Sequence, residues 1–417
     1  MLSLHLNNKG SSFCGYVNRQ TPINRYFINN MTDFDRPIDR RGTSCVKYDS
    51  LIETFGRDDI IPLWVADMDF QTAPPIIDAV KRLAEHGVFG YTFRSQSSIE
   101  AFTEWVAKRY QWNIDPKWVG YSPGIVTALP VAIRVYTNPG DSVLIQTPVY
   151  PPFHAVINGD GRKLVTSPLI LKDGKYTVDF EDFESKLKEG IKLFILCNSH
   201  NPIGRVWSRE ELKRMGELCC KYGTVIFSDD IHSDLALYDN NHIVMASISK
   251  EISMNTVTAM APSKTFNVAG MLNSLIVSES EELLGIFNKE IEALHLNLGN
   301  IIGHAVMETA YRDCDEWLGQ LKGYLEKNID FTYDFFASEL PSVSFIKPEG
   351  SFLLWLDFTK MGLPHSEIRD RLLNVAKVGL NDGLAFGKEG DRFFRMNIGT
   401  QLSVIEEALK RIKQAFL

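Results

Sequence analysis

Between about residues 71 and 299, short apolar runs alternate with stretches of helical periodicity, and this pattern constrains the fold more than any other feature of the chain. Short runs rich in β-branched and aliphatic side chains are typical of buried strands. The clearest runs lie at 142–145, 193–197, 224–227, 256–260 and 275–277. Strands that alternate with helices build a mostly parallel sheet with helices on both faces, so we expect an α/β fold.

The order of predicted helices and strands changes after about residue 300. Long helical stretches at 310–340 precede short strands around Phe345, at 353–356 and at 393–397, and a helical period ends the chain. This order predicts a second, smaller α+β domain. A chain of 417 residues is long enough for two domains, at about 100–200 residues per domain.

One helix is marked by its own end signals. Ser208 and Glu211 form a capping-box pattern directly after Trp207. Lys221 and Gly223 supply the signals of a helix C-terminus. We therefore expect a helix between these signals.

Polar segments follow several of the predicted strands, at the sheet edge where a parallel sheet binds its ligands. These segments are 121–127, 146–151, 198–205 and 228–232, and Lys264 follows the run at 256–260. Burying an ammonium group costs several kcal/mol unless the group is paired or its pKa falls. Lys264 is therefore a surface or salt-bridged residue or a neutral amine, and a neutral amine can form a Schiff base.

Composition excludes several classes of partner. The formal net charge of −8 comes without long blocks of one sign, and an acidic surface repels nucleic acid and anionic membranes. No apolar run reaches the roughly 18–20 residues that span a bilayer. The six cysteines show no Cys-x-x-Cys spacing, which indicates reduced thiols in a cytosolic protein, and we expect Cys219 to fill a core.

Five collinear segments carry a resemblance to a known family. They are PLWVADMDF at 62–70, CNSHNPIGRVW at 197–207, APSKTFNVAG at 261–270, PEGSFLLWLDF at 348–358 and GLNDG at 379–383. Together with Arg395, they resemble the fold-type I pyridoxal-phosphate enzymes, the aminotransferase class I/II superfamily. The nearer resemblance is to the branch of cystathionine β-lyase-like C–S lyases, and it runs from about Met31 to Leu417.

The resemblance implies the architecture and the activity. It implies a seven-stranded, mostly parallel sheet in a large cofactor-binding domain at 71–299, and a smaller α+β domain formed by 31–70 and 300–417. It implies a cytoplasmic homodimer with active sites at the subunit interface. The reaction implied is α,β-elimination at the Cβ–S bond of cystathionine or another cysteine S-conjugate, which gives a thiol, pyruvate and ammonia. Two alternatives stay open: an amino-acid aminotransferase, and a lyase with an added regulatory protein-binding role.

The resemblance also assigns the reactive groups. Lys264 holds the aldehyde of pyridoxal 5'-phosphate and then acts as the catalytic base at Cα. Asp229 binds the pyridine nitrogen, although the neighbouring carboxylate of Asp230 competes for this role. His232 either holds Asp229 in place or is a histidine without a role.

The remaining cofactor contacts follow from the same resemblance. Asn201 binds the phenolic oxygen, unless 201–204 is only a structural turn. Tyr150 stacks on the ring, unless it is ordinary core. Gly124, Ile125 and Val126 offer backbone N–H groups to the phosphate at a helix start, a motif that also occurs as a plain helix entry.

Other residues complete the implied site. Tyr91 reaches the phosphate from a neighbouring subunit, and Ser263 belongs to the cofactor-binding set. Arg395 clamps the substrate carboxylate, with a structural salt bridge as the alternative. Ala66 and Asp67 are expected to bind substrate. We expect no metal.

Two positions depart from the pattern of the superfamily. Ala261 stands where many members have a phosphate-binding serine, three residues before the lysine. Leu272 stands where aminotransferases of the aspartate type have an arginine, eight residues after it. These departures leave the cofactor assignment standing, and they weaken the interpretation as a simple aminotransferase.

Residues 1–30 match nothing in the family pattern, and they lack the long apolar core of a secretory signal. We expect either a disordered extension or translation that begins at Met31.

Overall fold

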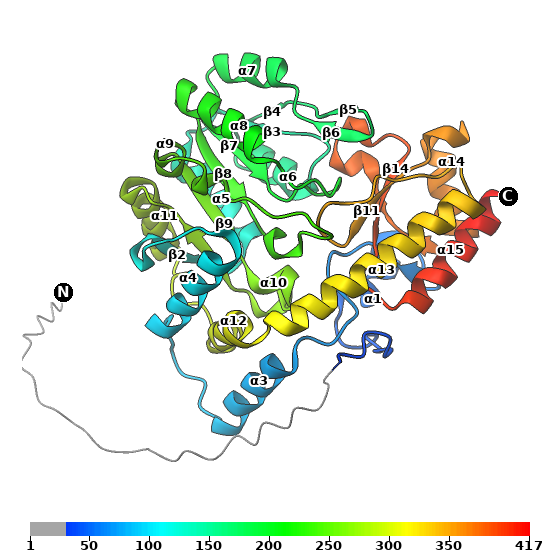
Figure 1. The fold of residues 1–417 in the computed structure, drawn as a ribbon, viewed down its shortest axis with the longest axis horizontal. Coiled ribbons are helices and arrows are strands. Elements are labelled where there is room, and N and C mark those ends of the chain that lie inside the picture. Colours follow the sequence, from blue (N-terminus) through cyan, green and yellow to red (C-terminus); the bar gives the residue numbers. More distant parts are fainter. Residues whose placement is uncertain (1–30) are drawn as a thin grey trace, which may run out of the picture. The chain divides into compact units, whose positions relative to one another are not determined.

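The computed structural model describes residues 31–417 and contains the predicted seven-stranded sheet (Figure 1). The strand order is β2-β10-β9-β8-β7-β3-β4. β10 runs antiparallel to both of its neighbours, and all other pairs in this sheet are parallel. In chain order the strands are β2 (Val119–Ser122), β3 (Ser142–Ile145), β4 (Lys163–Thr166), β7 (Leu193–Cys197), β8 (Val225–Asp229), β9 (Thr256–Met260) and β10 (Ser274–Val277).

Both faces of this sheet are buried, which explains why its strands are apolar throughout. Val143 and Ile145 pack on one face with helices α5 (Ile125–Tyr136), α6 (Pro151–Gly159) and α11 (Glu281–Ala293). Leu144 points to the other face, toward α7 (Phe180–Lys188) and α8 (Arg209–Tyr222). Successive side chains of a strand alternate between faces, so one run of apolar residues supplies two cores.

Helix α8 has the ends that the sequence predicts. The Ser208 hydroxyl accepts from the backbone N–H of Glu211, and the Glu211 carboxylate accepts from the N–H of Ser208. Gly223 closes the helix with φ +66°, in the left-handed region that favours glycine. Cys219 is fully buried in this helix, as expected for a core residue.

A second, smaller sheet lies in the C-terminal part of the chain. Strands β11 (Leu353–Asp357), β14 (Phe393–Asn397) and β13 (Asn381–Asp382) form it in that order, all antiparallel. Strand β1 (Ile61–Pro62) pairs in parallel with β12 (Val378–Gly379). This pairing joins the segment before residue 70 to the C-terminal part, as the family pattern implies, while the domain boundaries at 70 and 300 stay predictions.

The structure corrects one predicted element, the strand around Phe345, and gives the bounds of the helical stretches at 310–340. There α12 (Ile301–Asp313) ends at Cys314, and α13 (Asp315–Glu339) begins directly after it. Phe345 lies in irregular backbone, where a single bridge joins Ser344 to Asp357. Helix α13 contacts α12 at one end and α15 (Leu402–Phe416) toward the other, so it links the two parts of the fold (Figure 1).

The other regular elements complete the fold. They are α1 (Val46–Asp49), α2 (Leu51–Phe55), α3 (Pro74–His86), α4 (Gln96–Tyr110), β5 (Ile170–Lys172), β6 (Lys175–Thr177), α9 (Lys250–Met254), α10 (Pro262–Thr265), α14 (His365–Asp370) and a π-helical turn at Arg371–Val375. Among residues 31–417, no helix is long and apolar enough to cross a membrane. The predictions about residues 1–30 fall outside the described residues.

Candidate active site

A cavity of about 200 Å³ lies at the carboxyl ends of strands β7, β8 and β9. Cys197 and Asp229 end two of these strands and line it, and Ala261 follows the third. Most residues that the sequence predicts for the site line this cavity: Ala66, Gly124, Ile125, Val126, Tyr150, Asn201, Asp229, His232, Ser263 and Lys264. Asp67, Tyr91 and Arg395 are not in its lining.

Lys264 stands in the short helix α10 directly after β9, and its half-buried side chain lines the cavity. Its Nζ donates to the carbonyl oxygen of Ala66 at 2.6 Å. Burial, together with the positive charge of Arg395, lowers the pKa of Lys264 to about 8 against the opposing effects of Asp67 and Asp229. A substantial fraction of the amine is therefore neutral near pH 8, the form that attacks a carbonyl carbon.

Asp229, and not Asp230, faces the cavity. Burial raises the pKa of Asp229 to about 7, and Asp230 adds to this rise, while the backbone N–H of Ile231 and the charge of Lys264 oppose it. Asp230 points away, where its carboxylate accepts from Asn198 at 3.3 Å and lies 2.7 Å from Nε2 of His242. The carboxylate of Asp229 is thus left for a cationic ligand, while that of Asp230 is occupied within the protein.

Arg395 projects from β14 and is almost fully buried. Its Nη1 donates to Oδ1 of Asn201 at 3.0 Å, and its Nη2 donates to the Trp64 carbonyl at 3.0 Å and to Oδ1 of Asn381 at 2.6 Å. Within residues 31–417, no carboxylate forms an ion pair with this guanidinium, and its Nε has no hydrogen-bond partner. Burial lowers the pKa of Arg395 to about 10. The structural salt bridge considered from the sequence is absent from the described residues.

The N-terminus of helix α5 borders the same cavity. Gly124 is the N-cap, no side chain of the described residues caps the helix, and Gly124, Ile125 and Val126 all line the cavity. Thr127, which the sequence did not single out, lines it too. Free backbone N–H groups and the helix dipole make such a terminus suitable for an anion.

Three further residues predicted from the sequence line the same cavity. His232 is buried, and this burial, together with Lys264 and Arg395, lowers its pKa to about 3, so it is neutral at pH 7. Its Nδ1 has no hydrogen-bond partner among residues 31–417. Tyr150 presents its ring to the cavity, where burial raises its pKa, and Ser263 lies beside Lys264.

Tyr91 lies elsewhere on its own subunit. Its side chain is fully exposed and borders a separate cavity with Phe89 and Tyr121. Pro123 and Leu272 line both that cavity and the one that contains Lys264, so the two are neighbours. Within a single chain, Tyr91 is not part of the lysine cavity.

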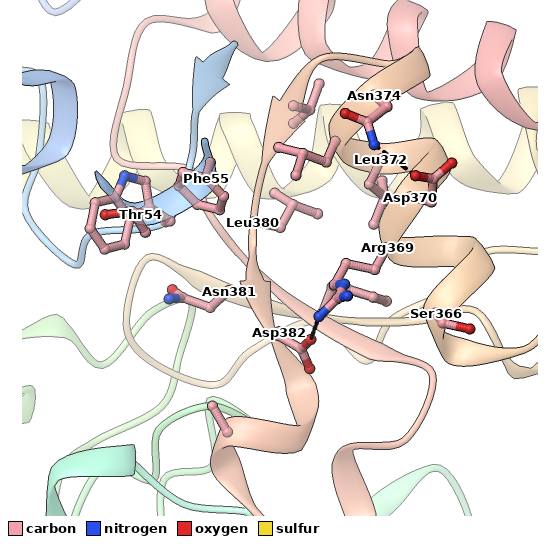
Figure 2. A pocket seen from close by; sticks show the side chains of 15 residues that line it. Thr54, Phe55, Ser366, Arg369, Asp370, Leu372, Asn374, Leu380, Asn381 and Asp382 are labelled. Carbon is pink, nitrogen blue, oxygen red and sulfur yellow. Dashed lines mark hydrogen bonds and ion pairs between the residues drawn. The ribbon is translucent and has the colours of Figure 1, made fainter. Parts of the chain in front are cut away.

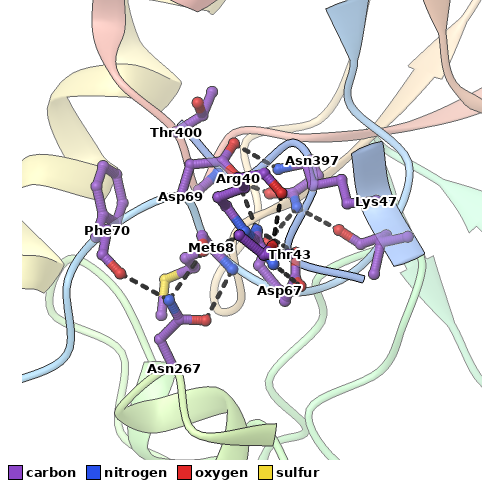
Figure 3. A network of polar contacts seen from close by, with 12 residues as sticks. Arg40, Thr43, Lys47, Asp67, Met68, Asp69, Phe70, Asn267, Asn397 and Thr400 are labelled. Atoms are coloured by element: carbon purple, nitrogen blue, oxygen red, sulfur yellow. Dashed lines mark hydrogen bonds and ion pairs between the residues drawn. The ribbon is translucent and has the colours of Figure 1, made fainter. Parts of the chain in front are cut away.

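The wall that carries Ala66 is held by a network of buried charges (Figure 3). Arg40 contacts Asp67 at 2.6 Å and Asp69 at 2.8 Å, and Lys47 contacts Asp69 at 2.6 Å. Asp67 therefore supports this wall through Arg40 and is not part of the lining. The amide of Asn397, from strand β14, donates to the carbonyl of Asp67 at 2.6 Å.

Asn267 and Asn381 are polar groups that sequence reasoning missed. Asn267, three residues after the lysine, accepts from the N–H of Met68 at 3.0 Å and donates to the Phe70 carbonyl at 2.8 Å (Figure 3). Asn381 lies in a segment that carries the family resemblance, but its bond to Arg395 depends on the pairing of β13 with β14. Both lie in segments that carry the family resemblance, at 261–270 and 379–383, and that membership was the available signal.

The fold and this cavity define a class of protein, and comparison with known proteins agrees with it. The sequence profile of the family Aminotransferase class I and II matches residues 58–412. The chain belongs to this family.

Three known proteins are similar to this chain over most of its length. Cystathionine β-lyase PatB of Bacillus subtilis (strain 168) is 42% identical over 384 residues, which is 92% of this chain and 99% of that protein. The solved structure of a PLP-bound putative aminotransferase from Clostridium difficile 630 is 41% identical, with a TM-score of 0.91, and covers 93% of this chain and 100% of that one. Cystalysin from Treponema denticola, which contains pyridoxal 5'-phosphate, is 33% identical with a TM-score of 0.89, over 92% of this chain and 98% of that one.

Proposed function

We propose that this protein binds pyridoxal 5'-phosphate and cleaves the Cβ–S bond of cystathionine or a related cysteine S-conjugate. One observation carries the proposal: Lys264, Asp229 and Arg395 lie near one another, the last two buried and Lys264 half-buried, and no ion pair joins any of them to another residue among 31–417. Buried charges that lack partners are costly unless a ligand pairs with them. The identity to a cystathionine β-lyase over most of the chain supports the same reaction.

The residues of the cavity fit the cofactor group by group. Lys264 offers an amine to the aldehyde, and Asp229 offers a carboxylate to the pyridine nitrogen. The start of α5 suits the phosphate, and Tyr150 suits the ring face. Asn201 offers its side-chain amide, whose oxygen already accepts from Arg395. When bound, the cofactor stores the negative charge that develops at Cα of the substrate.

The protein's own residues then carry out three tasks. Arg395 holds the α-carboxylate through the donor that has no partner in the protein, and so fixes the Cα–H bond. Lys264 takes the proton from Cα, and a pKa of about 8 suits a general base near neutral pH. The Cα–H and Cβ–S bonds break, and the leaving sulfur departs as a thiol. With one water the remaining carbons yield pyruvate and ammonia.

Elimination is supported over amino-group transfer by two residues of the site. Ala261 and Leu272 both line the cavity, at the positions where many superfamily members carry a serine and aspartate-type aminotransferases carry an arginine. An aminotransferase shares the first proton abstraction with the lyase. The two activities differ in whether the group at Cβ leaves.

The test uses purified holoenzyme and L-cystathionine without any 2-oxo acid. We expect pyruvate, ammonia and a free thiol in equal amounts, and Lys264→Ala protein as the control should form none. Activity that appears only after a 2-oxo acid is added, with no pyruvate from cystathionine, would replace the lyase by an aminotransferase.

We also propose that the active unit is a homodimer in which Tyr91 reaches the cofactor phosphate of the partner subunit. Phe89, Tyr91 and Phe93 are all exposed, and large exposed apolar groups clustered on one segment favour an interface. Two inactive variants, Tyr91→Ala and Lys264→Ala, should regain activity when they are unfolded and refolded together. Random pairing leaves one repaired site in half of the dimers, so about a quarter of the wild-type activity is expected. No recovery in verified mixed dimers would refute the shared site.

A cytoplasmic location completes the proposal. Cys45, Cys197, Cys219, Cys220 and Cys314 are all free thiols. Reduced cysteines suit a reducing compartment.

A further inference from the structure

The guanidinium of Arg395 is held in place by neutral groups within residues 31–417. Its Nη1 donates to Asn201, and its Nη2 donates to the Trp64 carbonyl and to Asn381, at 2.6–3.0 Å. The ring centre of Phe386 lies 5.0 Å from the central carbon of the guanidinium. These contacts fix the orientation of the guanidinium, and none of them brings a negative charge that would neutralise it.

The register of the small sheet puts Asn381 directly beside Arg395. Strands β13 and β14 are antiparallel, and these two residues are partners in the pairing. Side chains of directly opposed residues lie on the same face of a sheet, with Cβ atoms about 4.5–5.5 Å apart. Oδ1 of the half-buried Asn381 therefore reaches Nη2 of Arg395, at 2.6 Å.

The next residue on β13 is acidic, but the strand turns it away from Arg395 (Figure 2). Successive side chains of a strand point to opposite faces. Asp382 accordingly lies 2.9 Å from Nε2 of His365 and 3.9 Å from Nη1 of Arg369. The strand thus presents the neutral amide of Asn381 to the guanidinium of Arg395 and its carboxylate to other residues.

We propose that Asn381 is a positioning residue for substrate binding, which fixes the guanidinium of Arg395 and, because it is neutral, leaves the charge for the substrate carboxylate. The proposal rests on the proposed function, in which Arg395 holds the α-carboxylate. A carboxylate in place of this amide would have nearly the same size. It would also form an ion pair with Arg395 and compete with the substrate.

The first experiment compares two substitutions of Asn381 in the holoenzyme. In Asn381→Asp, the KM for L-cystathionine should rise about 50-fold with kcat within about three-fold of wild type, because the introduced carboxylate competes for Arg395. In Asn381→Ala, which removes one hydrogen bond but leaves the charge available, KM should rise about five-fold. A residue needed only for packing gives the opposite order, since the near-isosteric substitution disturbs packing least. That opposite order would overturn the proposal.

Asn374→Asp is the matched control. Asn374 and Asn381 both line a separate cavity of about 560 Å³ (Figure 2). Asn374 is exposed, and it bonds to Arg57 and Asp370. A charge that is screened by solvent and does not touch Arg395 should leave KM within about two-fold of wild type. Equal increases of KM in Asn374→Asp and Asn381→Asp would overturn the proposal, because contact with Arg395 would then not be the cause.

The second experiment measures the protein without cofactor. Cofactor-free Asn381→Asp should unfold at a higher urea concentration than wild type, because the buried guanidinium of Arg395 gains an ionic partner. Loss of packing alone cannot raise both the KM and the stability. A lower urea midpoint would show that no stabilising ion pair forms, and it would overturn the proposal.

The third experiment separates this proposal from the lyase reaction. L-alanine has an α-carboxylate but no leaving group, and its binding to the holoenzyme is measured by the change in visible absorption. Its dissociation constant should rise about 50-fold in Asn381→Asp, in line with the KM of cystathionine. Absence of pyruvate from cystathionine in wild-type protein would refute the lyase, whereas an unchanged affinity for L-alanine in Asn381→Asp would refute the role of Asn381.

Discussion

Two groups of buried and half-buried charges lie beside the 64–69 segment, and they differ in whether the protein pairs them. Arg40, Lys47 and Asp69 form ion pairs at 2.6–2.8 Å with carboxylates or cations of their own group. Lys264 and Arg395 form no ion pair within residues 31–417, and their hydrogen bonds go to neutral oxygens. Each charge of the first group has an ion-pair partner within the protein, whereas Lys264 and Arg395 have none within residues 31–417.

The pKa values show the same contrast. Burial alone lowers the pKa of Arg40, but Asp67 and Asp69 outweigh it and raise this pKa, whereas burial lowers the pKa of Arg395 to about 10. Burial alone raises the pKa of Asp69, but Lys47 and Arg40 outweigh it and lower this pKa, whereas the pKa of Asp229 rises to about 7. A buried charge that is paired has its desolvation cost offset within the protein, whereas a buried charge whose partner is an absent ligand does not.

The largest effect should come from Lys264→Ala. Without the amine, the cofactor has no covalent attachment and Cα has no base, so turnover should fall by roughly 10⁴-fold or more. The visible absorption of the lysine-bound cofactor should disappear as well. Because an unpaired buried charge is removed, the free energy of unfolding of the cofactor-free protein should not decrease. Turnover near the wild-type rate in this variant would show that Lys264 is not required for catalysis.

The next largest effect should come from Arg395→Met. The loss of charge-assisted hydrogen bonds to the α-carboxylate should lower kcat/KM by about 100-fold, mainly through KM. Urea unfolding of the cofactor-free variant should show a stability close to that of wild type, because removing an unpaired buried charge offsets the loss of its three hydrogen bonds. A marked loss of stability would mean that Arg395 serves the fold.

Lys47→Met tests the paired group. Removing one partner of a buried pair leaves Asp69 only partly compensated, so the free energy of unfolding should fall by about 3 kcal/mol, measured in urea. Lys221→Met is the matched control, because Lys221 pairs with Glu184 at the surface, where a loss below about 1 kcal/mol is expected. Equal losses in the two variants would erase the contrast between buried and exposed pairs.

The most gradual effect concerns pH, because it is spread over more than two pH units. The pKa of Lys264 is about 8 in the fold and 10.5 as a free side chain, so between these values the unfolded chain binds the extra proton. The stability of the cofactor-free protein should therefore gain a contribution that rises with pH from about 8 to 10.5, by up to about 3 kcal/mol. Lys264→Met should lack this contribution. Identical pH profiles for the two proteins would show that the amine is not desolvated.

The elements that the sequence predicted well depend on neighbours along the chain. The strand at 256–260 matches β9, and the capping box and Gly223 bound α8, because periodicity and end signals act over a few residues. Phe345 was placed in a strand because an apolar run alone does not show whether a partner strand is available.

The sequence by itself determined the α/β fold, the family, and the residue types that a pyridoxal-phosphate site needs. Only the tertiary structure decided which charges are paired. Asp67 meets Arg40 across 27 residues and lies behind the wall, whereas Arg395 meets Asn201 across 194 residues and has no carboxylate partner in the described chain. Pairing depends on which side chains the packed elements bring within a few ångströms, and short-range patterns in a sequence carry little information about such long-range contacts.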